Sequence, residues 1–242
     1  MRAEPSEKSE MVSQLLFGEH FAVIEKIEKW LHIKSMIDDY QGWISSNMTN
    51  DLPDDFSIAN TPRVICTRYV DCVISGKPVI LPGGSIIRKT HYDSSLQLAN
   101  NNNFCTNKNL GELAKQYLGA PYLWGGKTIF GIDCSGLVQI ICRMAGHWLP
   151  RDASQQAQIG HEITHEIANA NDIAFFCDNN GKITHTGILC DANNIIHSSG
   201  FVRIDRIDKK GIFNETENRY THKLHSIRRL LASITLRRFL HE

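Results

Sequence analysis

The sequence lacks both a long apolar run and an excess of one charge. No segment approaches the ~18 apolar residues of a membrane-spanning helix, and the first residues lack the apolar stretch of a signal peptide. Lysine plus arginine and aspartate plus glutamate both number 26, so the formal net charge is zero. A protein without a broad basic face is poorly suited to bind a phosphate backbone. We therefore expect neither a membrane span nor a nucleic-acid partner.

Closely paired cysteines are missing as well. The seven cysteines form an odd set without a CxxC pair, which favours reduced thiols over a disulfide framework or a zinc site. His161 and His165 have the HExxH spacing of a zinc peptidase, in the stretch HEITH at 161–165, but their polar surroundings favour surface residues over a metal site. We expect no metal and no cofactor, and a reducing cytoplasm is the simplest compartment for such a chain.

The chain does contain enough apolar residues for a folded core. With 242 residues, of which 42% are hydrophobic, it is long enough for one large domain or two small ones. Short apolar alternations separated by turn residues fill 11–44 and 63–87, which predicts β structure. We place a small all-β barrel at 1–50 and a second, more divergent β module at 51–98.

The second half of the chain has a different pattern. Asparagines at 100–103 mark a linker, and apolar residues then recur at helical spacing over 108–118 and 134–145. Three predicted strands follow, separated by turn residues, at 172–177, 183–190 and 194–198. Helices before an antiparallel meander indicate an α+β fold. We assign 104–231 to this domain and 232–242 to a C-terminal tail.

Cys134 stands where a nucleophile can be activated. It begins the second predicted helix, directly after a turn in which Asp133 can act as the N-cap. A thiol attacks an amide only as a thiolate, and its pKa of about 8.5 falls at a helix N-terminus beside an imidazolium. The small Ser135 leaves room for a substrate. A buried structural cysteine is the alternative interpretation.

Two histidines lie on neighbouring predicted strands. His185 and His197 flank a predicted tight turn at 191–193, which would pair their strands antiparallel. Both imidazoles could then lie on one face, where one acts as a general base and the other orients it. A structural role is the alternative for each. The other histidines that we expect at the surface are His147, His161, His165, His222 and His225.

Aromatic and acidic residues flank Cys134 in the sequence. Tyr122 and Trp124 precede it, and two glycines follow Trp124, so they could form an aromatic wall along a substrate groove. Asp152 follows a Pro-Arg pair and could bind a substrate ammonium group. The alternatives are core aromatics and an ordinary loop aspartate.

Three segments carry a resemblance to a known family. Residues 119–126 read GAPYLWGG, residues 131–138 read GIDCSGLV and residues 149–152 read LPRD. In this order, and with His197 twelve residues beyond His185, they resemble the NlpC family of bacterial cell-wall cysteine peptidases. The resemblance covers roughly residues 108–230, and residues before 50 resemble bacterial SH3-like domains.

The resemblance implies a papain-like α+β catalytic fold behind one or two SH3-like barrels. It implies that Cys134 is the nucleophile, that His185 is the base and that His197 orients His185. The backbone N–H of Cys134 and a side chain near Tyr122 would stabilise the oxyanion. Substrate contacts are expected from Tyr122, Trp124, Asp133, Ser135 and Asp152.

Within the family, the combination looks most like γ-D-glutamyl-L-diamino acid endopeptidases, which release L-Ala-D-Glu from cell-wall peptides with a free N-terminal L-Ala. There, Asp152 would hold the substrate ammonium together with an acid and a tyrosine of the first SH3-like domain, for which Glu4 and Tyr40 are the candidates. The expected partner is a cell-wall-derived peptide containing diaminopimelate or lysine. An acyltransferase or amidase of the same fold and a non-catalytic wall-peptide-binding protein are the alternatives, and the oligomeric state stays open.

Overall fold

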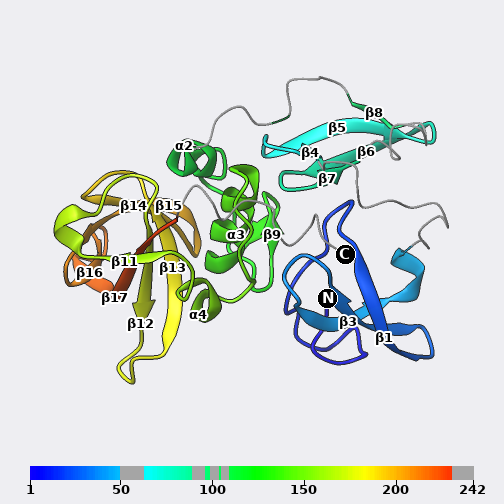
Figure 1. The fold of residues 1–242 in the computed structure, drawn as a ribbon, viewed down its shortest axis with the longest axis horizontal. Helices are drawn as coiled ribbons and strands as arrows, with labels where there is room; N and C mark the ends of the chain where they lie inside the picture. The colour runs from blue at the N-terminus through cyan, green and yellow to red at the C-terminus, as the bar shows by residue number, and fades with distance from the viewer. Residues whose placement is uncertain (50–62, 89–95, 99–103, 105–108, 231–242) are drawn as a thin grey trace.

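The computed structural model describes residues 1–49, 63–88, 96–98, 104 and 109–230. Figure 1 shows an N-terminal sheet in blue, a group of short strands in cyan, and an α+β part formed by the second half of the chain. The predicted linker at 100–103 and the predicted tail at 232–242 lie outside the described residues.

The N-terminal part is an antiparallel sheet with a small core of its own. Its elements are β1 (Phe21–Ile27), β2 (Trp30–Ser35), β3 (Gln41–Ser45) and the 3-10 helix η1 (Ser46–Met48), with the strands in the order β1-β2-β3. Leu31 and Ile33 are two residues apart on β2, so they lie on one face, where they pack with Ile44 of β3. The β structure predicted for 11–44 is confirmed.

A second group of strands follows. These are β4 (Arg63–Val64), β5 (Tyr69–Ile74), β6 (Lys77–Pro82), β7 (Ile86–Ile87) and β8 (Gln97–Leu98). A tight turn joins β5 to β6, and both of its central residues, Ser75 and Gly76, have the positive φ that a type I′ hairpin requires. The β structure predicted for 63–87 is confirmed, and its SH3-like character stays a prediction.

The second half of the chain forms helices on a closed sheet. Its helices are α2 (Leu110–Lys115), α3 (Cys134–Met144), α4 (Ala153–Gln156) and the 3-10 helix η3 (His165–Ile167). Its strands are β9 (Lys127–Thr128), β10 (Gly131–Ile132), β11 (His161–Ile163), β12 (Ile173–Cys177), β13 (Ile183–Leu189), β14 (Asn194–Ser199), β15 (Phe201–Asp208), β16 (Gly211–Asn214) and β17 (Arg219–Arg229). The large antiparallel sheet has the order β11-β17-β12-β13-β14-β15-β16, and it closes into a barrel because β16 also pairs with β17.

Helix α3 lies between this barrel and the N-terminal sheets (Figure 1). Every one of its residues is buried. Its apolar side chains share one core with Phe175 and Ile188 of the barrel and with Leu16 and Cys66 of the N-terminal half. The N-terminal half therefore completes the core around the helix that begins with Cys134.

The N-terminal domain is also joined to the α+β domain by buried charges. The carboxylate of Glu19 accepts a hydrogen bond from Nζ of Lys127 at 3.0 Å and another from Arg143. Nearby, Nε2 of Gln139 donates to Oδ2 of Asp38 at 2.9 Å. A buried ion cluster of this kind requires both domains to be in place, because removing one partner leaves the others unpaired.

The predicted helices and the three predicted strands of the second half are confirmed, and together they establish the α+β class. Strands β15 to β17, which close the barrel, were not predicted. The expectation of reduced thiols throughout is wrong, because Cys66 is disulfide-bonded. Cys72, Cys134, Cys142, Cys177 and Cys190 carry free thiols.

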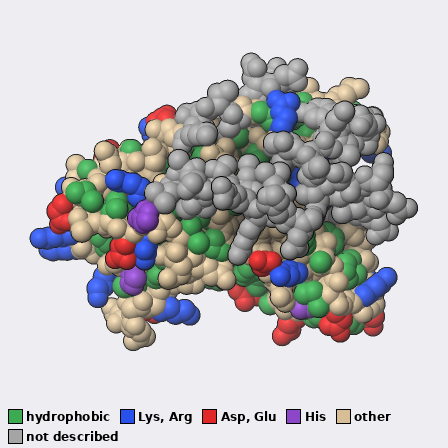
Figure 2. Space-filling view, in the orientation of Figure 1, with side chains coloured by type: hydrophobic (Ala, Val, Ile, Leu, Met, Phe, Trp, Pro, Cys, Tyr) green, Lys and Arg blue, Asp and Glu red, His purple; other side chains and the backbone are tan. Residues whose placement is uncertain are grey.

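The surface has mixed charge. On the face shown in Figure 2, Lys and Arg side chains are interspersed with Asp and Glu over the described residues. Within the described part of the chain, no helix has the length and apolarity to cross a bilayer, and α3 has 11 residues.

Candidate active site

Cys134 is the first residue of α3, and the local sequence explains why the helix begins there. Asp133 caps the helix, since its Oδ1 accepts a hydrogen bond from the backbone N–H of Gly136 at 2.7 Å. Helix α3 packs against β13, and the sulfur of Cys134 is hydrogen-bonded by the backbone of Thr186, the residue after His185. The fold therefore brings the predicted nucleophile to the strand that carries the predicted base.

The environment of Cys134 holds the proton on the sulfur. Burial, followed by the negative charge of Asp133, raises the pKa of the Cys134 thiol to about 11, although hydrogen bonds from the backbone of Thr186 and Ser135 act in the opposite direction. The sequence analysis expected a lowered pKa at this helix N-terminus. Desolvation is the largest contribution to this raised pKa, since Cys134 is only 8% exposed.

His185 and His197 form a buried hydrogen-bonded pair. The two strands pair with Gly187 opposite His197, and Nε2 of His185 lies 2.8 Å from Nδ1 of His197. This confirms that both imidazoles lie on one face of the β13–β14 hairpin. Further along, Nε2 of His197 lies 3.0 Å from Oδ2 of Asp205, which also accepts from Nε of Arg203 at 2.9 Å. Asp205 lies on β15, a strand the sequence analysis did not predict.

Both histidines are uncharged at neutral pH. Burial, followed by the nearby His222 and His197, holds the pKa of His185 well below its usual range. Burial also lowers the pKa of His197, although Asp205 opposes this shift. The predicted nucleophile and the predicted base are therefore both neutral before any reaction.

His222 corrects the sequence analysis, which assigned it to the surface. It is half-buried on β17, and its ring stacks on that of His185 with centroids 4.0 Å apart and planes 25° from parallel. Its sequence context is polar, so no local pattern indicated this position. Only the pairing of β17 with β12 and β16 brings it to the base.

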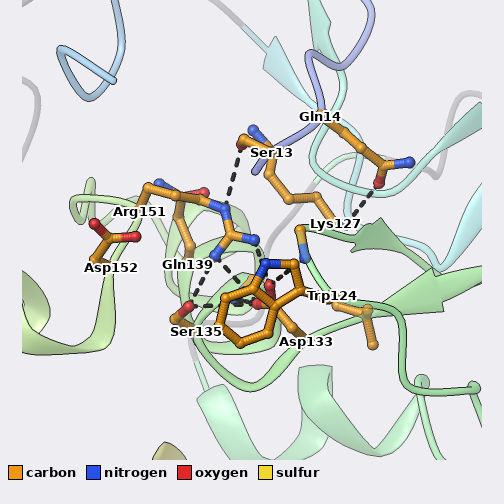
Figure 3. Close-up of polar contacts among 12 residues, drawn as sticks. Ser13, Gln14, Trp124, Lys127, Asp133, Ser135, Gln139, Arg151 and Asp152 are labelled. Atoms are coloured by element: carbon orange, nitrogen blue, oxygen red, sulfur yellow. Dashed lines mark hydrogen bonds and ion pairs between the residues drawn. The ribbon is translucent and has the colours of Figure 1, made fainter. Parts of the chain in front are cut away.

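Asp133 and Ser135 are held by a buried arginine (Figure 3). The guanidinium of Arg151 bridges both carboxylate oxygens of Asp133 and donates to Oγ of Ser135 at 2.8 Å. It also donates from Nε to Oγ of Ser13 in the N-terminal domain, at 3.2 Å. These contacts hold the start of α3 in place, and direct contact of Asp133 and Ser135 with a substrate stays a prediction.

The loop before β9 lies along the N-terminal domain. Nε1 of Trp124 donates to Oε1 of Glu10 at 2.5 Å. The backbone N–H of Lys127 donates to Oε1 of Gln14 at 2.7 Å (Figure 3). Trp124 is nonetheless 59% exposed, as a residue that contacts a ligand can be. The sequence analysis missed Glu10, an acidic residue of the N-terminal domain that reaches this loop.

Tyr122 lies beside Cys134 with its hydroxyl protonated. Burial, followed by the charge of the nearby Cys134, raises the pKa of Tyr122 to about 12. A hydroxyl in that state can donate a hydrogen bond. The expectation of an oxyanion donor near Tyr122 stays a prediction.

Tyr40 and Asp152 meet between the two domains. Their side chains are hydrogen-bonded; burial and then the charge of Asp152 raise the pKa of Tyr40 to about 12. Burial raises the pKa of Asp152, although Arg151 and Tyr40 partly offset it. Glu4 is exposed and its backbone N–H bonds Oγ of Ser9, so its contact with a substrate stays a prediction. Of the two SH3-domain candidates, the structure brings Tyr40 to Asp152.

A helix-start cysteine, a strand histidine and a second polar residue that orients it define the papain-like class of cysteine-dependent sites. Among the described residues, no group of three or more His, Cys, Asp or Glu is arranged to hold a metal ion. The N-terminal domain contributes Tyr40, which interacts with Asp152, and Glu10, which accepts from Trp124.

Comparison with known proteins identifies the domains. Residues 119–222 match the NlpC/P60 family, and residues 1–48 match the bacterial dipeptidyl-peptidase SH3 domain. The chain therefore contains an NlpC/P60 domain of papain-like fold, with a bacterial SH3 domain before it. A crystal structure of an NlpC/P60 family protein from Bacillus cereus superimposes with a TM-score of 0.77 over 91% of this chain and 82% of that chain, at 22% identity, which shows the shared fold.

Curated relatives match shorter or more divergent stretches. The γ-D-glutamyl-L-lysine dipeptidyl-peptidase of Bacillus subtilis is 40% identical over 84 residues, which are 34% of this chain and 28% of that protein. Dipeptidyl-peptidase 6 of Lysinibacillus sphaericus is 28% identical over 72% of this chain and 77% of its own length. The chain thus spans only 26% to 28% of the length of three curated relatives that it matches.

Proposed function

We propose that this protein is a cysteine peptidase that hydrolyses the amide between γ-D-Glu and an L-diamino acid in cell-wall peptides with a free N-terminal L-Ala, releasing L-Ala-D-Glu. The observation that carries the proposal is the contact between Tyr40 and Asp152, which joins an SH3-domain hydroxyl to a carboxylate beside Arg151. The names of the B. subtilis and L. sphaericus relatives support a dipeptidyl-peptidase activity.

The proposed reaction uses the neutral thiol–imidazole pair. As the sulfur of Cys134 attacks the amide carbon, its proton passes to the nitrogen of His185 that does not face His197. The hydroxyl of Tyr122 and the backbone N–H of Cys134 would donate to the oxyanion. His185 then protonates the leaving amine, which breaks the C–N bond and leaves a thioester that water hydrolyses.

Specificity for a free amine would come from the two domains together. An ammonium group seated at Asp152 would replace the hydrogen bond that Tyr40 now donates and would favour the ionised carboxylate. We assign Glu10 as a second acidic residue that would attract the substrate ammonium, because its carboxylate reaches Trp124. The described contact of Glu4 is with Ser9, within its own loop. A peptide with a blocked amine would leave the carboxylate desolvated and unpaired.

Mass spectrometry of the products tests the proposal. Wild type, Cys134→Ala and Asp152→Asn are incubated with L-Ala-γ-D-Glu-diaminopimelate, with its lysine counterpart and with each peptide N-acetylated. We expect wild type to release L-Ala-D-Glu from the free peptides alone, and Cys134→Ala to release none. Asp152→Asn should lower kcat/KM for free peptides by about 10- to 100-fold, because a charge-assisted contact is lost.

The other outcomes separate the alternatives. Equal cleavage of the acetylated peptides would exclude the ammonium site and keep the peptidase. Transfer of the L-Ala-γ-D-Glu group to an added amine would indicate an acyltransferase. Binding without cleavage would indicate a wall-peptide-binding protein. The proposed cytoplasmic location is a separate prediction, and the disulfide at Cys66 argues against it, because such bonds are rare in reducing compartments.

A further inference from the structure

A chain of hydrogen bonds leads from the proposed base, His185 on β13, to the carboxylate of Asp205 on β15. His185 bonds His197 through Nε2 and Nδ1 at 2.8 Å, and Nε2 of His197 lies 3.0 Å from Oδ2 of Asp205. Strands β13, β14 and β15 are consecutive neighbours, and each contributes one residue. Both histidines are buried, so water cannot replace either partner at low cost.

Asp205 is itself held in place. Nε of Arg203 donates to its Oδ2 at 2.9 Å, and Nη1 of the same guanidinium donates to the backbone oxygen of Ser199 at 2.7 Å. Arg203 and Asp205 are two residues apart on β15, so they lie on one face of the strand, and Arg203 pairs with His197 in the β14–β15 register. The carboxylate therefore has a fixed position relative to His197.

The direction of each hydrogen bond follows from the carboxylate. Burial would raise the pKa of Asp205, but hydrogen bonds from His197 and Arg203 keep it below its usual value, so the group is ionised and can only accept. Nε2 of His197 must then carry a proton. In a neutral imidazole the other nitrogen holds a lone pair, so Nδ1 of His197 accepts the proton of His185 Nε2.

We propose that Asp205 is a positioning residue that fixes the tautomers of His197 and His185, so that Nδ1 of His185 keeps the lone pair that receives the Cys134 proton. This inference rests on the proposed roles of Cys134 and His185 and adds a fourth member to their site. Without the carboxylate, His197 can protonate at Nδ1 instead. His185 would then carry its proton on Nδ1, where it cannot act as the base.

Nuclear magnetic resonance of wild-type protein tests the tautomers directly. In ¹⁵N–¹H correlation spectra of the histidine rings at neutral pH, assigned with His185→Gln and His197→Gln variants, we expect both rings to be protonated at Nε2 and not at Nδ1. A His185 ring protonated at Nδ1 would overturn the proposal. This measurement requires neither a substrate nor an Asp205 variant that folds.

Variants of two aspartates on the same strand test the consequence. Asp208 ends β15 and bonds the hydroxyl of Tyr220 at an exposed site, so Asp208→Asn is a matched control for Asp205→Asn. For Asp205→Asn we expect kcat to fall about 10²- to 10⁴-fold with little change in KM, the range that a misplaced general base produces. Asp208→Asn should stay within about twofold of wild type, and Asp205→Glu should recover part of the lost activity.

The rate at which iodoacetamide alkylates Cys134 tests the role of Asp205 without any peptide substrate. The rate of iodoacetamide modification, followed for the peptide containing Cys134 by mass spectrometry, should fall at neutral pH in Asp205→Asn and not in Asp208→Asn. If wild type cleaves none of the wall peptides, the proposed substrate is wrong, while the tautomers and the alkylation rates still decide the role of Asp205. Wild-type kcat and alkylation in Asp205→Asn would refute it.

Discussion

At the scale of single residues, His222 sets the environment of the proposed base. Its ring covers that of His185, and burial, with His197 and Arg203, lowers the pKa of His222 to about 4, while Asp205 opposes the shift. His222 is therefore neutral at neutral pH and acts by excluding water. A desolvated His185 stays neutral, and so stays a base, to a lower pH than a solvated one.

Replacing His222 by alanine should raise the pKa of His185, since water would reach its ring. A base works only when deprotonated, so a raised pKa means that activity is lost at a higher pH on acidification. We expect the acid limb of the kcat/KM profile to move up by about one pH unit. His222→Phe, which keeps the stack, and His225→Ala at an exposed site on the same strand should leave the limb in place. An unmoved limb in His222→Ala would contradict the shielding role.

At the scale of elements, the segment from Trp124 to Lys127 follows the N-terminal residues because Gly125 has no side chain. A Cβ at Gly125 would lie 2.4 Å from the backbone oxygen of Met11, and its φ of +77° is one that other residues rarely adopt. The sequence analysis took the two glycines as part of a substrate groove. The structure shows that Gly125 permits domain contact, and its N–H also donates to Asp133 at 2.8 Å.

Gly125→Ala should therefore lower the free energy of unfolding by more than the positive φ alone would, because the added Cβ also meets Met11. Gly181 is the matched control, because its φ is +80° and nothing lies within 4 Å of an added Cβ. We expect Gly181→Ala to lower the free energy of unfolding by about 1 kcal/mol and Gly125→Ala by about 2 to 4 kcal/mol. Urea denaturation measures both. Equal losses would mean that the contact with Met11 has no effect on stability.

At the scale of the whole molecule, the buried cluster around Glu19 ties the SH3 domain to the α+β domain. Its side chain is 1% exposed between Lys127 and Arg143. Burial by itself would raise the pKa of Glu19, but the two cations hold it below its usual value. A carboxyl whose pKa is lowered on folding stabilises the protein above its unfolded pKa, and this contribution is lost as the pH falls through the folded pKa.

Glu19→Gln should lower the free energy of unfolding by about 3 to 5 kcal/mol, because it leaves two buried cations without their counter-charge. Glu217→Gln is the control, since Glu217 pairs with Arg219 at the surface, and it should cost at most about 1 kcal/mol. Urea unfolding at neutral pH and near pH 4 measures both. The difference between Glu19→Gln and wild type should shrink at the lower pH, and a constant difference would exclude an electrostatic origin.

The sequence by itself determined the α+β class, the helix that begins at Cys134 and the hairpin that pairs His185 with His197. Those features depend on local signals: apolar spacing, an N-cap and a tight turn, each contained within a short stretch of chain. The segments around Cys134 also sufficed to indicate the NlpC/P60 domain that the family comparison finds at 119–222.

Only the tertiary structure decided what surrounds those residues. Asp205 and His222 lie on strands β15 and β17, and they reach the base because the sheet closes into a barrel, which depends on pairings between distant segments. The pKa of Cys134 rises because packing removes water, and no local pattern records burial. The meeting of Tyr40 with Asp152 and of Glu10 with Trp124 likewise follows from the packing of one domain on the other, since these partners are more than one hundred residues apart in the chain.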